Sequence, residues 1–126
     1  MLVLDSGALS RLSGRTKMAL SLIRALSSGG LWPPTVPTIV LVESLQGDPR
    51  RDANVHRFLK TCLIDVALPE RTARRAAELR RRARAGSAVD AVVVALAEPG
   101  GTVLTGDRAD IEALTAVADR VAVQVV

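Results

Sequence analysis

Four acidic residues lie beside apolar segments in this sequence of 126 residues. Asp5 directly follows Met1–Leu4, and Asp107 follows V-L-T after a single glycine. Glu43 interrupts the apolar stretch I-V-L-V-E-S-L, and Asp90 precedes V-V-V-A-L. An ionised carboxylate in apolar surroundings is costly unless it is paired with a cation or bound to a metal. The four acids therefore raise the question of what neutralises them.

The sequence offers these acids no basic neighbours. No Lys or Arg occurs in residues 1–10, 37–47 or 86–105. Carboxylate oxygens are hard ligands, which favour Mg²⁺ or Mn²⁺ over zinc. The single histidine, His56, and the single cysteine, Cys62, are too few for a zinc site, so we interpret them as a surface helix residue and a core residue. The acids thus predict a site for a hard divalent cation.

The overall charge indicates what such a site would act on. The net charge is +4 and the isoelectric point is about 10.5, so the surface should attract a nucleic acid or an acidic protein. One Trp, one Phe and no Tyr argue against a base-stacking platform, so contacts with RNA or DNA should run through arginine and phosphate. A bound Mg²⁺ would activate a water and offset charge at a phosphodiester. These features predict metal-dependent phosphodiester hydrolysis.

Each acid also has a purely structural interpretation. Asp107 and Asp110 have the three-residue spacing of a helix capping box, as do Ser87 and Asp90. Asp5 could cap the turn after the first strand, and Glu43 could lie on the solvent side of its helix. The metal hypothesis therefore requires that folding gathers side chains 5, 43, 90 and 107 around one cation.

Apolar runs and turn residues predict strands that alternate with helices. The expected strands are 2–5, a short edge strand within 32–36, 63–68, 102–105 and 121–126. The expected helices are 15–27, 39–46 capped by Thr38 and closed by Gly47, 51–61, one from Pro69 to Gly86, one from Ser87 to Pro99, and 110–114. This alternation predicts one α/β domain over residues 1–126, with a parallel sheet covered by helices on both faces. Ligands bind such sheets beyond the carboxyl ends of the strands, where Asp5 and Asp107 should both lie. If their two strands are neighbours, the strand ends are about 5 Å apart.

Four segments resemble the PIN-domain family, and within it the VapC-like ribonuclease toxins of type II toxin–antitoxin systems. They are V-L-D-S-G-A-L at 3–9, P-T-I-V-L-V-E-S-L at 37–45, S-A-V-D-A-V-V-V-A-L-A at 87–97, and V-L-T-G-D-R-A-D-I-E-A-L at 103–114. They occur in the family's order and span nearly the whole chain. The resemblance implies a three-layer fold with a mostly parallel five-stranded sheet and helices on both faces.

The resemblance also implies roles for particular residues. The four acids match the family's ligands for Mg²⁺ or Mn²⁺, which position the attacking water. Thr105 matches a hydroxyl residue that braces the site, and Asp110 matches a further acid that is a ligand or supports one. Many members have a hydroxyl residue where this chain has Gly7, and Ser6 would have to serve in its place. The toxins cut RNA, are silenced by a cognate antitoxin and commonly form homodimers.

Seven arginines follow one another closely on the helix that begins at Pro69. Among them, the candidates for contact with RNA or an antitoxin are Arg74, Arg75, Arg80, Arg81 and Arg82. A solvated helix face would show the same pattern. The sequence does not distinguish phosphate contact from docking of an acidic antitoxin segment or from simple solvation.

Our leading hypothesis is a metal-dependent endoribonuclease that acts as the toxin of a toxin–antitoxin pair. One alternative is a PIN nuclease of RNA processing that has no antitoxin. Another is a non-catalytic module that binds RNA or protein and uses its acids only as helix caps. No segment reaches the roughly 18 apolar residues of a membrane span, and the N-terminus lacks the features of a signal peptide, so we expect a cytoplasmic protein.

Overall fold

Five short strands form one parallel sheet in the computed structural model, which describes residues 1–126. The strands are β1 (Leu2–Leu4), β2 (Thr35–Pro37), β3 (Leu63–Asp65), β4 (Thr102–Thr105) and β5 (Ala122–Val125). Their order in the sheet is β3-β2-β1-β4-β5, and every neighbouring pair is parallel. The sheet is therefore all parallel rather than mostly parallel. The expectation of an edge strand within 32–36 was wrong, because β2 lies between β3 and β1.

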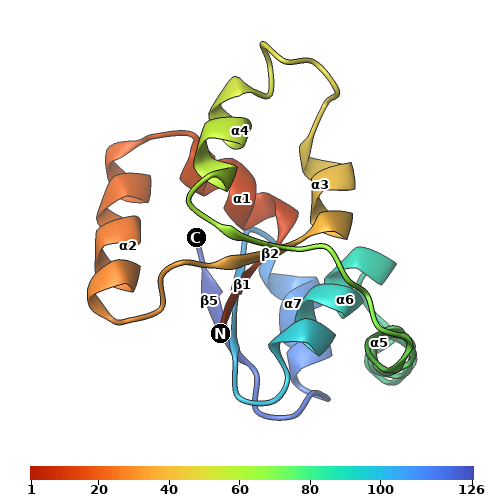
Figure 1. Ribbon diagram of the computed structural model, residues 1–126. Coiled ribbons are helices and arrows are strands. Elements are labelled where there is room, and N and C mark those ends of the chain that lie inside the picture. The colour runs from red at the N-terminus through yellow and green to blue at the C-terminus, as the bar shows by residue number, and fades with distance from the viewer.

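The strand order reverses between β1 and β4. The chain moves outward from β1 through β2 to β3, and then returns to the other side of β1 with β4 and β5. Right-handed crossovers place the helices of the first two connections on one face of the sheet and the later helices on the other. Figure 1 shows α1–α4 on one side and α5–α7 on the opposite side. This is the three-layer, PIN-like α/β fold that the sequence predicts, with helices on both faces.

The first helical layer contains α1 (Ser6–Ser13), α2 (Lys17–Ser28), α3 (Thr38–Ser44) and α4 (Ala53–Leu59). Helix α1 was not expected, and it packs against α2, α3 and α4 and against the two central strands. Thr38 is the first residue of α3 and not its cap, since Pro37 precedes the helix without a side-chain cap. The helix ends at Ser44, before the expected Gly47, because Leu45 is already extended.

The second layer contains α5 (Glu70–Ala83), α6 (Ala88–Ala97) and α7 (Arg108–Thr115). Helix α6 is apolar nearly all round and lies against β1 and β4, with α5 and α7 also packed on it. Ser87 caps α6, as its position in the sequence predicts. Helix α5 ends one turn before the expected Gly86, because Arg84 adopts the left-handed conformation with φ 51°. None of these helices is long and apolar enough to cross a membrane.

The core is aliphatic. It consists of buried Leu, Val, Ile and Ala side chains together with Phe58, which contacts half-buried Trp32 edge-to-face with ring centroids 6.0 Å apart. The strands β1 and β4 contribute the fully buried Val3, Leu4 and Leu104. Cys62 is half-buried, and His56 is exposed on α4. The carboxyl ends of β1 and β4 are thus held in place from both faces of the sheet.

Candidate active site at the switch point of the sheet

Asp5 is the first residue after β1 and is almost fully buried, with 4% of its surface exposed. Its Oδ1 atom accepts hydrogen bonds from the Ala8 N–H at 2.7 Å and the Gly106 N–H at 3.2 Å. The first bond caps α1, so the prediction that Asp5 caps the turn after the first strand is confirmed. The second bond joins the turn after β1 to the turn after β4. Asp5 therefore fastens together the two turns that flank the reversal of strand order.

Thr105 is fully buried and links Asp5 to Asp107. Its hydroxyl donates to Oδ2 of Asp5 and accepts from the Asp107 N–H at 2.8 Å. The Asp107 carbonyl oxygen lies 2.9 Å from the same hydroxyl and is an alternative acceptor for its single proton. The structure thus brings Asp5, Thr105 and the backbone of Asp107 into one hydrogen-bonded group.

Asp90 lies in the first turn of α6 and completes a capping box. Its Oδ2 accepts from the Ser87 N–H at 2.9 Å, while the Ser87 hydroxyl accepts from the Asp90 N–H at 3.1 Å. The last turn of α6 leads through Gly101 into the amino end of β4, so the helix runs back across the sheet from its carboxyl edge. Asp90 is half-buried at the start of that path.

The remaining predicted residues are less constrained. Glu43 is exposed near the end of α3, and its side chain has no hydrogen-bond or ion-pair partner. Asp107 precedes α7 and is exposed, but its side chain does not cap the helix. Asp110 and Ser6 are half-buried in the first turns of α7 and α1, and neither side chain makes a hydrogen bond. The capping-box interpretation of Asp107 and Asp110 was therefore wrong.

None of the candidate acids forms an ion pair. The salt bridges of the molecule join Arg74 to Glu70, Arg75 to Glu78 and Glu98, Arg82 to Glu78, Arg108 to Glu112, and Arg120 to Asp119. The carboxylates at the carboxyl edge are excluded from this set, as the lack of Lys and Arg in the neighbouring sequence predicts. Backbone N–H groups and the Thr105 hydroxyl are the only partners of the Asp5 and Asp90 carboxylates, and the other candidate carboxylates have none, which leaves them available to a cation.

The chemistry of the four predicted ligands suits a hard divalent cation, but the positions of their side chains in this structure do not. All four predicted ligands supply oxygen only, which suits Mg²⁺ or Mn²⁺. As the side chains stand, however, no three Asp, Glu, His or Cys residues converge closely enough to hold one metal ion. The four carboxylates therefore do not surround a common metal position in this structure. Asp5 is fixed by its three donors and Asp90 by its capping box, so metal binding would depend on other rotamers at Glu43 and Asp107, whose side chains have no partner.

Another buried carboxylate shows what a purely structural acid looks like in this chain. Asp52 is 3% exposed and accepts hydrogen bonds from the backbone N–H groups of Gln46, Gly47 and Asp48. These donors, Gln46 first, lower the pKa of Asp52. Its carboxylate closes the loop before α4, which is a structural role. Sequence inspection did not single it out, since D-P-R-R-D reads as an ordinary polar turn.

The arginines of α5 divide into two groups. Arg75 donates to both carboxylate oxygens of Glu98 at 2.8 Å, which raises the pKa of Arg75 and lowers the pKa of Glu98. Arg74 and Arg82 also face carboxylates on their own helix. Three of the five predicted contact residues are therefore engaged within the protein, while Arg80 and Arg81 form no ion pair.

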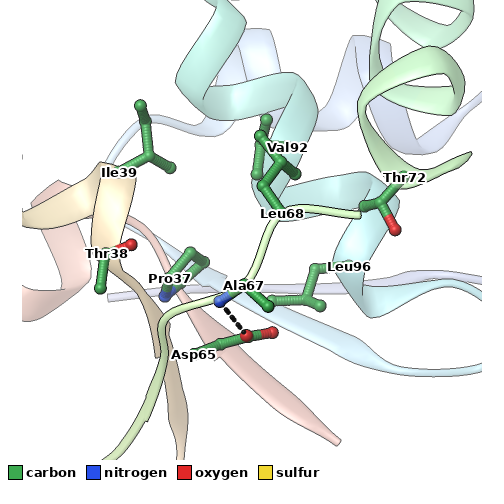
Figure 2. Close-up of a pocket in the computed structure, with 9 residues that line it drawn as sticks. All are labelled: Pro37, Thr38, Ile39, Asp65, Ala67, Leu68, Thr72, Val92 and Leu96. Carbon is green, nitrogen blue, oxygen red and sulfur yellow. Dashed lines mark hydrogen bonds between the residues drawn. The ribbon is translucent and has the colours of Figure 1, made fainter. Parts of the chain in front are cut away.

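A small recess also opens at the carboxyl ends of β2 and β3 (Figure 2). Its volume is about 30 Å³, and it is lined mainly by the apolar side chains of Pro37, Ile39, Leu68, Val92 and Leu96. The carboxylate of Asp65, the one acid there, accepts the Ala67 N–H at 3.1 Å. The recess contains no second titratable group, so it does not compete with the switch point as a site for chemistry.

The arrangement of strands and helices defines a PIN-like α/β domain. Its fold is similar to that of a chain in the crystal structure of VapBC2 from Rickettsia felis bound to a DNA fragment from their promoter, with a TM-score of 0.69 and 12% sequence identity. The match covers 99% of this chain and 98% of that chain. No family model matches the sequence, and no curated protein does so. The likeness is therefore one of fold over the whole length.

Proposed function

We propose that this chain is a divalent-metal-dependent endoribonuclease that acts as the toxin of a toxin–antitoxin pair. The observation that carries the proposal is the position of Asp5, Thr105 and Asp107 at the carboxyl ends of β1 and β4. These two strands flank the reversal of strand order, which is where parallel α/β sheets bind their ligands. Two acids without any cationic partner at that point, linked through the Thr105 hydroxyl and the Asp107 backbone, supply the oxygen ligands that a nuclease metal site needs.

Each residue then has a defined task. Asp5 is the rigid ligand, because three donors hold its carboxylate. Thr105 holds the turn after β4 against the turn after β1. It thereby fixes the position of Asp107, the residue just before α7. Glu43, Asp90 and Asp107 would complete the ligand set from α3, α6 and the turn before α7. When bound, Mg²⁺ or Mn²⁺ would supply an activated water and offset the charge of the scissile phosphate.

The catalytic proposal is tested by incubating the purified chain with single-stranded RNA in EDTA, Mg²⁺ or Mn²⁺. We expect cleavage only with a divalent cation, and none with Asp90→Asn, which keeps the size of the side chain. A second readout is independent of activity: Mg²⁺ or Mn²⁺ should raise the Tm of the wild-type chain more than that of Asp90→Asn. Metal without effect on either readout would favour the non-catalytic binding module.

The toxin role is supported by the fold match with a chain of a VapBC2 structure. It is tested by expressing the chain alone, as Asp90→Asn, and together with the neighbouring gene. Growth arrest that requires Asp90 and is relieved by the neighbour's product would support it. RNA cleavage without growth arrest, and with no protein partner from the adjacent gene, would instead favour a nuclease of RNA processing. The homodimer is tested separately, by sedimentation of the purified chain.

A further inference from the structure

The C-terminal end of α5 carries three arginines whose charge no carboxylate neutralises. Arg81 and Arg84 are exposed, and their side chains take part in no hydrogen bond or ion pair. Arg80 is also exposed, and its Nε donates only to the carbonyl oxygen of Gly86, at 3.3 Å. We call Arg80, Arg81 and Arg84 the α5 corner. It contrasts with Arg74, Arg75 and Arg82, which have carboxylate partners on the same helix or on Glu98.

The backbone of Arg84 sets where the α5 corner ends. Its φ of 51° is left-handed, and its N–H donates to the Arg80 carbonyl oxygen at 3.0 Å to close the helix. Glycine is the usual residue at such a position, because a Cβ there crowds the backbone. Arg15 and Arg120 share this left-handed conformation, so at Arg84 it ends α5 and does not by itself indicate a ligand.

The α5 corner adjoins the candidate active site. Gly86, which accepts the hydrogen bond from Arg80, is followed directly by Ser87, the cap of α6. A Cβ built on Gly86 would lie 3.6 Å from the Cβ of Asp90, so this turn touches the acid that the proposed metal site requires. Figure 1 shows α5 and α6 side by side in the second helical layer. The end of α5 that carries these three arginines therefore lies beside the turn that leads to Asp90.

We propose that the α5 corner binds backbone phosphates of the RNA strand that is cut at the switch point. The proposal rests on the function proposed above, which identifies the polyanion as RNA. Guanidinium groups bind phosphate oxygens in a bidentate fork, without reading the base. The corner would thereby hold an anionic substrate beside a group of carboxylates that repels it. RNA is favoured over an acidic protein segment because the corner lies next to Asp90, where the substrate has to be positioned.

The test compares two triple variants that remove the same charge from the same helix. One is Arg80→Ala, Arg81→Ala and Arg84→Gly, in which the glycine suits the left-handed backbone. The control is Arg71→Ala, Arg74→Ala and Arg82→Ala. Binding of a labelled single-stranded RNA is measured in EDTA, where the proposed cleavage does not occur, over a series of salt concentrations. Binding of poly-glutamate of matched length is measured in the same way, and this probe stands for an acidic protein segment.

We expect the corner variant to lose about 2 units from the slope of log K against log salt, since each phosphate contact on a single strand contributes about 0.7. The control should keep the wild-type slope, and poly-glutamate binding should change less than RNA binding. Equal losses in the two variants, or equal losses for the two probes, would overturn the proposal. Because cleavage is not measured here, a chain that binds RNA through the corner but never cuts it would refute only the nuclease proposal.

Discussion

Gly7 and Gly106 lie backbone against backbone, so closely that a Cβ built on either would stand 2.8 Å from the Cα of the other. Gly7 belongs to the first turn of α1, and Gly106 lies in the turn between β4 and α7. The contact sits beside the hydrogen bond from Gly106 to Asp5. The glycine at position 7 thus lets the two acid-bearing turns approach each other.

This contact predicts that Gly7→Ala will reduce both stability and RNA cleavage. Alanine normally stabilises a helix relative to glycine, but here its methyl group would collide with backbone, and such overpacking costs about 1–3 kcal/mol. The matched control is Gly14→Ala, where the added Cβ would meet its nearest atom at an ordinary 3.4 Å. Urea unfolding should show a loss for Gly7→Ala and none for Gly14→Ala. Full activity in Gly7→Ala would mean that the spacing of the turns does not matter for catalysis.

The hydroxyl of Thr105 is the second feature that can be tested by a single substitution. Thr105→Val keeps the shape but leaves the Asp107 N–H without its acceptor and Asp5 Oδ2 without its donor, at a cost of about 1–3 kcal/mol. Thr105→Ser keeps the hydroxyl and should retain most of the activity. We expect cleavage to fall at least tenfold in the valine variant under conditions where it is fully folded by circular dichroism. A valine variant as active as the serine variant would remove Thr105 from the site.

The sequence predicted the layers of the fold and the edge of the sheet that carries the acids. Continuous apolar runs next to Asp5 and Asp107 identified β1 and β4, and the apolar residues between Ser87 and Pro99 identified α6. Helix α1 was missed because Ser6 and Gly7 form helices poorly. The signal was present, however, in Asp5 as an N-cap and in Leu9 and Leu12 at helical spacing.

Side-chain geometry was beyond reach from the sequence. The spacing of Ser87 and Asp90 predicted a capping box, whereas the apolar surroundings of Asp90 suggested a metal ligand, and the structure contains the capping box. Arg74 and Arg82 pair with carboxylates on their own helix, but Arg75 also pairs with Glu98, which lies 23 residues away in sequence. Long-range pairs of this kind leave no local pattern. The same holds for the contact between Gly7 and Gly106, which depends on how two turns meet across the sheet.

Asp90 can serve as a cap and as a ligand, and two substitutions separate the roles. Asp90→Asn keeps an oxygen that can accept the Ser87 N–H, so we expect a stability change of less than about 1 kcal/mol and complete loss of cleavage. Ser87→Ala removes the hydroxyl that caps α6 and should cost about 1 kcal/mol while cleavage continues. Thermal unfolding and RNA cleavage are measured on both variants. An asparagine variant that loses stability but still cuts RNA would assign Asp90 to capping alone.

The bidentate pair of Arg75 and Glu98 predicts a loss of stability in acid. The side chain of Glu98 is 11% exposed and also accepts the Asp119 N–H at 2.7 Å, so it ties α5 to the loop before β4 and to the loop between α7 and β5. The hydrogen bond from Arg75 is the main cause that lowers the pKa of Glu98. The pair therefore contributes its full stability above the unfolded-state pKa of about 4.3, and this contribution disappears as the pH falls through the lower, folded-state value.

Glu98→Gln should accordingly reduce the free energy of unfolding by about 1–3 kcal/mol at pH 7, because it removes charge-assisted hydrogen bonds at a largely buried position. The difference between this variant and the wild type should shrink steadily below about pH 4, where the wild-type carboxylate is itself protonated. Glu70→Gln is the control, since its pair with Arg74 is 83% and 77% exposed and contributes little. Urea unfolding at a series of pH values measures both. A deficit in Glu98→Gln that persisted unchanged into strong acid would show that the glutamate acts through packing rather than through its charge.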